Sequence, residues 1–87
     1  MKLTIDLSGI TSRAVLHKIF QLHLDLPPYY GRNLDALHDC LAERQGETEI
    51  VLTNEDLLPE HMRPYISSLK KMLGDLAKAG KRVKIAE

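Results

Sequence analysis

The chain has 87 residues, of which 44% are hydrophobic and 28% are charged. A chain of this length buries only somewhat more than about 60% of its unfolded surface, so it cannot enclose a deep substrate cavity and keep a core. Twelve basic and twelve acidic side chains cancel, so any electrostatic function depends on where the charges lie. We expect residues 1–87 to form a single small domain.

The cysteine content indicates a reducing compartment. Cys40 is the single cysteine and cannot form an internal disulfide, which argues against a small secreted domain. The first residues alternate between apolar and polar types instead of forming the apolar run of a signal peptide, and no stretch of 18 apolar residues could span a membrane. We therefore expect a cytoplasmic protein that does not contact membranes.

The chain opens with a predicted strand and a predicted helix. Apolar and polar residues alternate over residues 3–7, as in a strand with one buried face. Thr11 or Ser12 can cap a helix that runs to about residue 24, and Pro27-Pro28 prevents its continuation. The buried side of this helix is predicted to comprise Val15, Leu16, Ile19, Phe20 and either His23 or Leu24.

An ordered loop and a second helix follow. Pro27 and Pro28 restrict the backbone of residues 26–31, and Gly31 allows a positive φ. Asn33 is a good N-cap for the next helix. The helical spacing places Leu34, Leu37 and Leu41 on one face, and Asp35, His38, Asp39 and Ala42 on the other.

The second half of the chain adds two strands and two helices. Residues 49–53 contain the apolar run 50–52, which is typical of a strand buried on both faces. A short helix is predicted over about residues 54–58, and a long helix over residues 64–80. Residues 81–86 form the last predicted strand.

Helical segments separate each strand from the next, so the connections are crossovers and the sheet is parallel. The sequence thus predicts the α/β class, as one small domain with a three-stranded parallel sheet and about four helices. It leaves the strand order open.

Residues 26–41 read LPPYYGRNLDALHDCL. This stretch resembles the barstar family, whose hallmark is the string L-P-x-Y-Y-G-x-N-L-D-A-L-x-D-x-L. The rest of the chain agrees more weakly, through its opening strand, its long helix and its final strand. The resemblance implies a barstar-like fold, and as function an intracellular inhibitor that blocks the active site of a guanyl-specific, barnase-like microbial ribonuclease. It implies neither an enzyme nor a cofactor.

The resemblance also implies a binding surface. A ribonuclease active site is a cationic cluster shaped for phosphate, and a carboxylate of suitable reach can take the place of that phosphate. Asp39 is expected to be this carboxylate, with Asp35 meeting nearby donors and Asp75 adding a second acidic point. The full set of partner-binding residues is Tyr29, Gly31, Asn33, Leu34, Asp35, His38, Asp39 and Asp75.

Several residues of this segment also have a purely structural interpretation. The carboxylates of Asp35 and Asp39 can be a solvated helix face. Gly31 can serve only the turn, and Asn33 only the cap. Tyr30 fits the core and the interface equally well.

Arg32 and Arg44 depart from the best-known member of the family, which carries an acidic residue and a tryptophan at these positions. We expect a partner of the same class with a different rim, in which an acidic group meets Arg32 or Arg44. Cys40 lies beside the apolar stripe of its helix and is expected to be a small buried hydrophobe.

Two other functions compete with inhibition. His38-Asp39 resembles a ligand pair of metal phosphohydrolases, but no histidine spacing matches a zinc site, so we predict no metal. A small nucleic-acid-binding domain could use the basic C-terminal region, which lacks aromatic side chains for base stacking. Its residues are Lys70, Lys71, Lys78, Lys81, Arg82 and Lys84. We favour a protein-binding module without direct nucleic-acid contact, and the sequence leaves self-association open.

Overall fold

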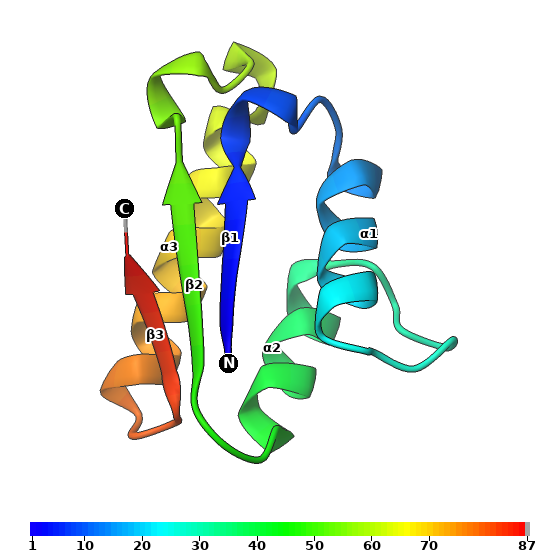
Figure 1. Cartoon of the computed structure of the whole chain (residues 1–87), viewed down its shortest axis with the longest axis vertical. Coiled ribbons are helices and arrows are strands. Elements are labelled where there is room, and N and C mark those ends of the chain that lie inside the picture. The colour runs from blue at the N-terminus through cyan, green and yellow to red at the C-terminus, as the bar shows by residue number, and fades with distance from the viewer. Residues whose placement is uncertain (87) are drawn as a thin grey trace.

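The structure is a computed structural model that describes residues 1–86 (Figure 1). One parallel sheet has the strand order β1-β2-β3, with β1 at Lys2–Asp6, β2 at Thr48–Thr53 and β3 at Val83–Ala86. The α-helices are α1 (Arg13–His23), α2 (Leu34–Glu43) and α3 (Arg63–Lys78), and short 3-10 turns are η1 (Leu7–Gly9), η2 (Glu55–Leu57) and η3 (Glu60–Met62). The predicted α/β fold with a three-stranded parallel sheet is confirmed. No helix within residues 1–86 has the length and apolar character needed to cross a bilayer.

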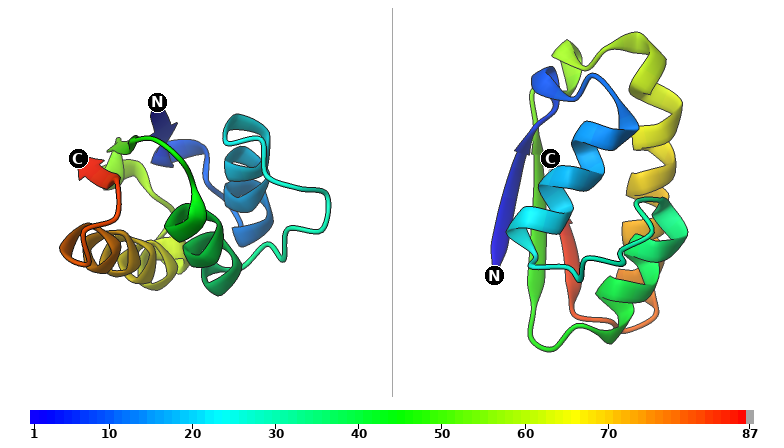
Figure 2. Two further views of the ribbon diagram at one scale, coloured as in Figure 1. Left: turned by 90° about the horizontal axis from the view of Figure 1, so that it is seen from below. Right: turned by 90° about the vertical axis from the view of Figure 1, so that its right-hand side faces the viewer.

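The three α-helices all cover one face of the sheet (Figure 2, right). Both crossovers step in the same direction along the sheet, from β1 to β2 and from β2 to β3, and crossovers of one hand then place their helices on one side. The prediction that residues 50–52 are buried on both faces is therefore wrong for Val51, which lies on the uncovered face and is half-buried. Ile50 and Leu52 face the helices and are buried.

The core fills the space between the sheet and this helical layer. Alternate strand residues supply one side of it, and the apolar stripes of the helices supply the other. Each large aliphatic side chain buried in this way contributes about 1.5–3 kcal/mol. The strand side comprises Leu3, Ile5, Ile50, Leu52 and Val83, and the helix side includes Leu16, Phe20, Leu37, Leu41, Ile66, Leu69, Leu73 and Leu76.

The structure resolves two alternatives that the sequence leaves open in α1. Ser12 is the N-cap, because its Oγ accepts a hydrogen bond from the N–H of Val15 at 3.2 Å. Leu24 is buried, whereas His23 is exposed. The C-cap residue Leu24, directly after the helix, therefore belongs to the core.

Several element boundaries differ from the predicted ones. Leu7 begins η1 instead of ending β1, because Asp6 caps that turn by accepting from the N–H of Ser8 at 3.0 Å. A turn that contains Gly80, at φ 80°, separates α3 from β3, so the last strand begins at Val83. The short helix predicted after β2 is the 3-10 turn η2.

We predict that Gly74→Ala raises the free energy of unfolding by about 0.5–1 kcal/mol, because glycine inside a helix costs about that much relative to alanine. Gly74 lies within α3, and apart from its own helix no atom is within 4 Å of the place that a Cβ would take. Urea denaturation measures the change. Gly80→Ala is the matched control and should destabilise, since its φ of 80° disfavours a side chain. A loss of stability in Gly74→Ala would contradict the prediction that a methyl group fits at position 74 of α3.

Candidate functional site

Helix α2 carries the predicted acidic surface. It begins at Asn33, whose Oδ1 accepts a hydrogen bond from the N–H of Ala36 at 2.7 Å, so the predicted N-cap is confirmed. Leu37 and Leu41 are buried against the core, which turns the opposite face of the helix outward. That exposed face carries Asp35, His38 and Asp39.

The carboxylates of α2 form a stripe that stability does not explain. Asp35, Asp39 and Glu43 follow one another at four-residue spacing, where like charges disfavour an isolated helix by about 0.2–0.5 kcal/mol per pair. Asp35 lies in the first turn, where the helix dipole favours an acid, but Glu43 ends the helix, where the dipole opposes one. We call Asp35, Asp39 and Glu43 the carboxylate stripe. The sequence interpretation recognised its first two members only, although the spacing could have revealed the third.

His38 contacts one member of this stripe. Its Nδ1 lies 3.3 Å from Oδ1 of Asp39, and both side chains are largely exposed. The imidazole and the carboxylate are therefore neighbours on the exposed face of α2.

A cleft of about 470 Å³ lies between α2 and the loop at residues 25–31. The loop side is formed by Asp25, Leu26, Pro27, Tyr29, Tyr30 and Gly31, and the α2 side by Ala36, Asp39, Cys40, Glu43 and Arg44. Its wall is partly apolar, and its acidic groups are Asp25, Asp39 and Glu43.

Cys40 is half-buried at this wall, and burial raises the pKa of its thiol, with smaller contributions from Glu43 and Asp39. The thiol is therefore a poor nucleophile at neutral pH.

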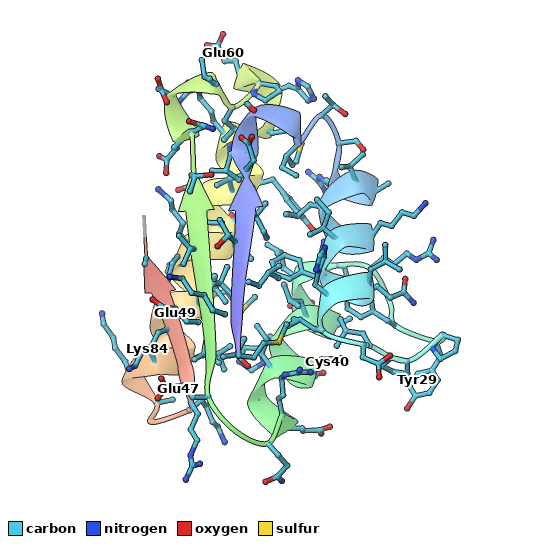
Figure 3. All side chains as sticks on the ribbon, viewed as in Figure 1. Tyr29, Cys40, Glu47, Glu49, Glu60 and Lys84 are labelled. Atoms are coloured by element: carbon cyan, nitrogen blue, oxygen red, sulfur yellow. The ribbon has the colours of Figure 1, made fainter. Side chains whose placement is uncertain are left out.

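Tyr29 and Tyr30 point in opposite directions. The side chain of Tyr29 is 87% exposed, and Figure 3 shows it at the outer tip of the loop. Tyr30 is 5% exposed and belongs to the core, which decides the question left open for it by the sequence. The exposed Tyr29 ring is available to supply contact area to a partner.

Gly31 does not use the positive φ that glycine allows. The left-handed residues in this part of the chain are Asp25, at φ 52°, and Arg32, at φ 56°. Gly31 lies close to the start of α2 instead, because a Cβ there would lie 3.1 Å from the Cβ of Ala36. A side chain at position 31 would therefore require Ala36 or the loop to shift by a few tenths of an ångström.

Arg44 is engaged within the protein. Its Nη1 donates a hydrogen bond to the carbonyl oxygen of Leu24 at 2.7 Å, and its Nη2 lies 3.5 Å from Sδ of Met1. The side chain thereby joins the end of α2 to the end of α1 at the base of the cleft. Arg32, by contrast, is exposed.

The structure brings three of the predicted partner-binding residues, Tyr29, Gly31 and Asp39, to the lining of the cleft. Asp75 is exposed on α3, the helix that packs against α2, and does not line the cleft. The remaining predicted residues lie at the N-cap and along α2, and they are Asn33, Leu34, Asp35 and His38.

A buried histidine of α1 forms a hydrogen bond with the loop at residues 25–31. His17 of α1 has no exposed surface; its Nδ1 lies 2.5 Å from the Tyr30 hydroxyl and its Nε2 lies 2.6 Å from the Tyr65 hydroxyl of α3. The guanidinium of Arg13 lies over the Tyr65 ring, 4.4 Å from its centroid. Sequence reasoning missed this group, although His17 precedes the buried Phe20 by three residues and so shares its face of α1.

The surroundings of His17 favour its neutral form. Burial lowers the pKa of the imidazole, and the positive charge of Arg13 lowers that pKa further. Burial raises the pKa of the Tyr30 phenol, and it also raises the pKa of the Tyr65 phenol, where Arg13 opposes it. At neutral pH the group is therefore a chain of uncharged hydrogen-bonding side chains.

The basic region proposed for nucleic acid is partly neutralised by the protein itself. Lys84 Nζ lies 3.1 Å from Oε1 of Glu47, and these two side chains lie close together in Figure 3. Lys70 forms an ion pair with Glu55. Such pairing reduces the charge that this region can offer to a phosphate backbone.

Comparison with known proteins decides the family. The sequence profile of the family described as Barstar (barnase inhibitor) matches residues 1–86. This chain belongs to the barstar family. Among curated proteins it is 52% identical over 52 residues to the "Putative ribonuclease inhibitor YrdF" of Bacillus subtilis, a match that covers 60% of this chain and 54% of that protein. The match thus spans about half the length of this relative.

A second likeness is confined to a segment. The chain is 37% identical over 49 residues to the hydroxylamine reductase of Thermotoga maritima, which covers 56% of this chain and 11% of that enzyme. The shared part is about a tenth of the enzyme.

We predict that acid destabilises the protein through His17. Because its pKa is lower in the folded than in the unfolded state, the unfolded chain binds the proton first as pH falls. Its contribution to stability is complete above about pH 6.5 and is lost below it, by at most about 1.4 kcal/mol per pH unit. Urea denaturation from about pH 7 to about pH 5 measures this slope. His17→Gln should show a shallower slope than the exposed control His23→Gln, and equal slopes would exclude His17 as the source.

Proposed function

We propose that this barstar-family protein is an intracellular inhibitor of a guanyl-specific, barnase-like ribonuclease, and that it blocks the active site with α2 and the loop at residues 25–31. The observation that carries the proposal is the exposed Asp39 carboxylate at a cleft flanked by the exposed Tyr29 ring. The family membership and the printed name of the Bacillus subtilis relative support it. Cytoplasmic location is part of the same proposal.

The chemistry rests on replacing phosphate by carboxylate. A ribonuclease must hold an RNA phosphodiester in a cluster of cationic donors, and that cluster presents two or three N–H groups to the phosphate oxygens. The Asp39 carboxylate offers two oxygens of the same charge on a rigid helix. Once water is excluded, such charge-assisted hydrogen bonds become strong, and the substrate can no longer enter.

The other surface residues surround this anchor. The Tyr29 ring supplies a large contact area at low cost in side-chain entropy. Asp35 lies one turn before Asp39 on α2, Asp75 adds an exposed carboxylate on α3, and His38 lies beside Asp39. Gly31, Asn33 and Leu34 fix the junction of loop and helix, where their backbone and apolar groups can meet the partner.

The surface is largely prepared before binding. Asn33 caps α2 and its Nδ2 donates to the carbonyl oxygen of Gly31 at 3.3 Å, while the N–H of Tyr30 donates to the carbonyl oxygen of Pro27 at 2.9 Å. Fewer groups then lose freedom when the partner arrives, which favours tight association.

We predict that Asp39→Ala is the most damaging single substitution. Removing one partner of a desolvated ion pair leaves the cationic cluster unpaired and costs about 3–5 kcal/mol, which is at least about a hundredfold in the inhibition constant. RNA cleavage by a guanyl-specific ribonuclease, titrated with the protein, gives that constant.

Glu60→Ala is the matched control for Asp39→Ala, because Glu60 is an exposed carboxylate at the end of the molecule far from Tyr29 (Figure 3). It should leave inhibition unchanged. Absence of inhibition by the wild-type protein, together with a shift of RNA in a gel, would contradict the proposal and favour the nucleic-acid-binding alternative.

The rim proposal now concerns Arg32, since the guanidinium of Arg44 is bonded to Leu24. We predict that Arg32→Asn weakens binding to the natural partner by about twofold to fivefold, and that Arg32→Asp weakens it more, because an exposed ion pair is worth about 0.2–1 kcal/mol. Asparagine and aspartate both tolerate the positive φ of residue 32, so the backbone is preserved. Titration calorimetry measures the affinity, and unchanged binding by both variants would rule out an acidic rim.

A further inference from the structure

We propose that His17 and Tyr65 are positioning residues of the binding surface: through Tyr30 they hold the loop at residues 25–31 in the shape that presents Tyr29. This inference rests on the proposed function for its meaning, although its structural part can be tested without any ribonuclease. Neither residue lines the cleft, so neither is expected to touch the partner directly.

The loop has few other attachments to the body of the protein. Its start is held by neighbours in sequence: the N–H of Leu26 donates to the carbonyl oxygen of Gln21 at 3.0 Å, and Gln21 Nε2 donates to the carbonyl oxygen of Pro27 at 3.1 Å. Its end is held by Asn33, which bonds Gly31. Leu26 packs partly against the core, whereas Tyr30 is buried and its hydroxyl lies 2.5 Å from Nδ1 of His17.

The proton positions that satisfy this group follow from burial. A neutral imidazole has one N–H donor and one bare nitrogen that accepts. Tyr30 is buried, so its hydroxyl proton is best used on Nδ1 of His17. Nε2–H then donates to the hydroxyl oxygen of Tyr65, which is half-buried and whose own proton can reach water. In this tautomer every hydrogen-bond donor of the side chains of Tyr30, His17 and Tyr65 has an acceptor.

The hydrogen bonds of His17 with Tyr30 and Tyr65 have a direct consequence for the binding surface. Tyr29 precedes Tyr30 and points outward, so the direction of its ring depends on how Tyr30 is held. A hydrogen bond is directional, and here it joins the loop to α1 and, through the second bond, to α3. Apolar packing alone would allow the phenol of Tyr30 to rotate or slide, and the loop would follow.

The first experiment uses the free protein. Amide hydrogen exchange, measured by NMR, should speed up about threefold to tenfold at the loop amides of Leu26 and Tyr30 in Tyr65→Phe and in His17→Leu, since a hydrogen bond contributes about 0.5–1.5 kcal/mol. Exchange in β2 should change less than at the loop. His17→Gln keeps one donor and one acceptor and should restore part of the protection.

The second experiment measures binding. Stopped-flow dissociation of the complex with a guanyl-specific ribonuclease should be about threefold to tenfold faster for Tyr65→Phe and His17→Leu, with His17→Gln between them and the wild type. Val83→Ala is the stability control, because Val83 is buried in β3 and belongs to neither loop nor cleft. It lowers the unfolding free energy but should leave the dissociation rate within about twofold.

The two arms separate the two proposals. If the wild type fails to bind the ribonuclease, the proposed function is wrong, and the exchange data alone decide whether His17 and Tyr65 fix the loop. If the wild type binds, while Tyr65→Phe and His17→Leu leave both the loop exchange and the dissociation rate as in Val83→Ala, the positioning role is overturned.

Discussion

The arrangement of the binding surface depends on the two hydrogen bonds that the buried His17 imidazole makes with the phenols of Tyr30 and Tyr65. Burying a polar ring costs free energy unless its nitrogens are bonded, and here each nitrogen meets a phenol. The two phenols belong to the loop and to α3, while the imidazole belongs to α1. A single side chain therefore joins three segments that are distant in the sequence. Apolar contacts bring these segments together, but the directional bonds decide how the loop lies on them.

Around this junction the protein tolerates two locally unfavourable features. The carboxylate stripe places like charges at four-residue spacing, and Arg32 holds a left-handed backbone that favours glycine. Both features lie on α2 or just before it, near the cleft, whereas the core beneath contains buried leucines and isoleucines. Features that lower local stability at an exposed surface, above a stable core, are expected where that surface serves binding.

The limits of sequence reasoning here have identifiable physical causes. Caps and helical stripes are local, so Ser12, Asn33 and the buried leucines of α2 could be predicted from spacing alone. The half-exposure of Val51 could not, because it depends on both crossovers stepping in one direction, which no local pattern encodes. Glycine at position 31 allows a left-handed backbone, but the structure places that conformation at Arg32 and brings Gly31 close to Ala36 instead, and neither outcome follows from a local pattern. Long-range partners of polar side chains were likewise hidden: Arg44 bonds Leu24, and His17 bonds Tyr65.

The inward turn of Arg44 changes the electrostatic character of the cleft. With its guanidinium bonded to a backbone carbonyl at 2.7 Å, it is less available to a partner, and the cleft is dominated by Asp25, Asp39 and Glu43. The net charge of the chain is zero, so its long-range field is weak, and the acidic surface acts mainly within a screening length of about 8–10 Å. A cationic active site would then be guided only in the last stage of approach. Selectivity must therefore come from fit at contact, which is where a loop held by directional hydrogen bonds has its effect.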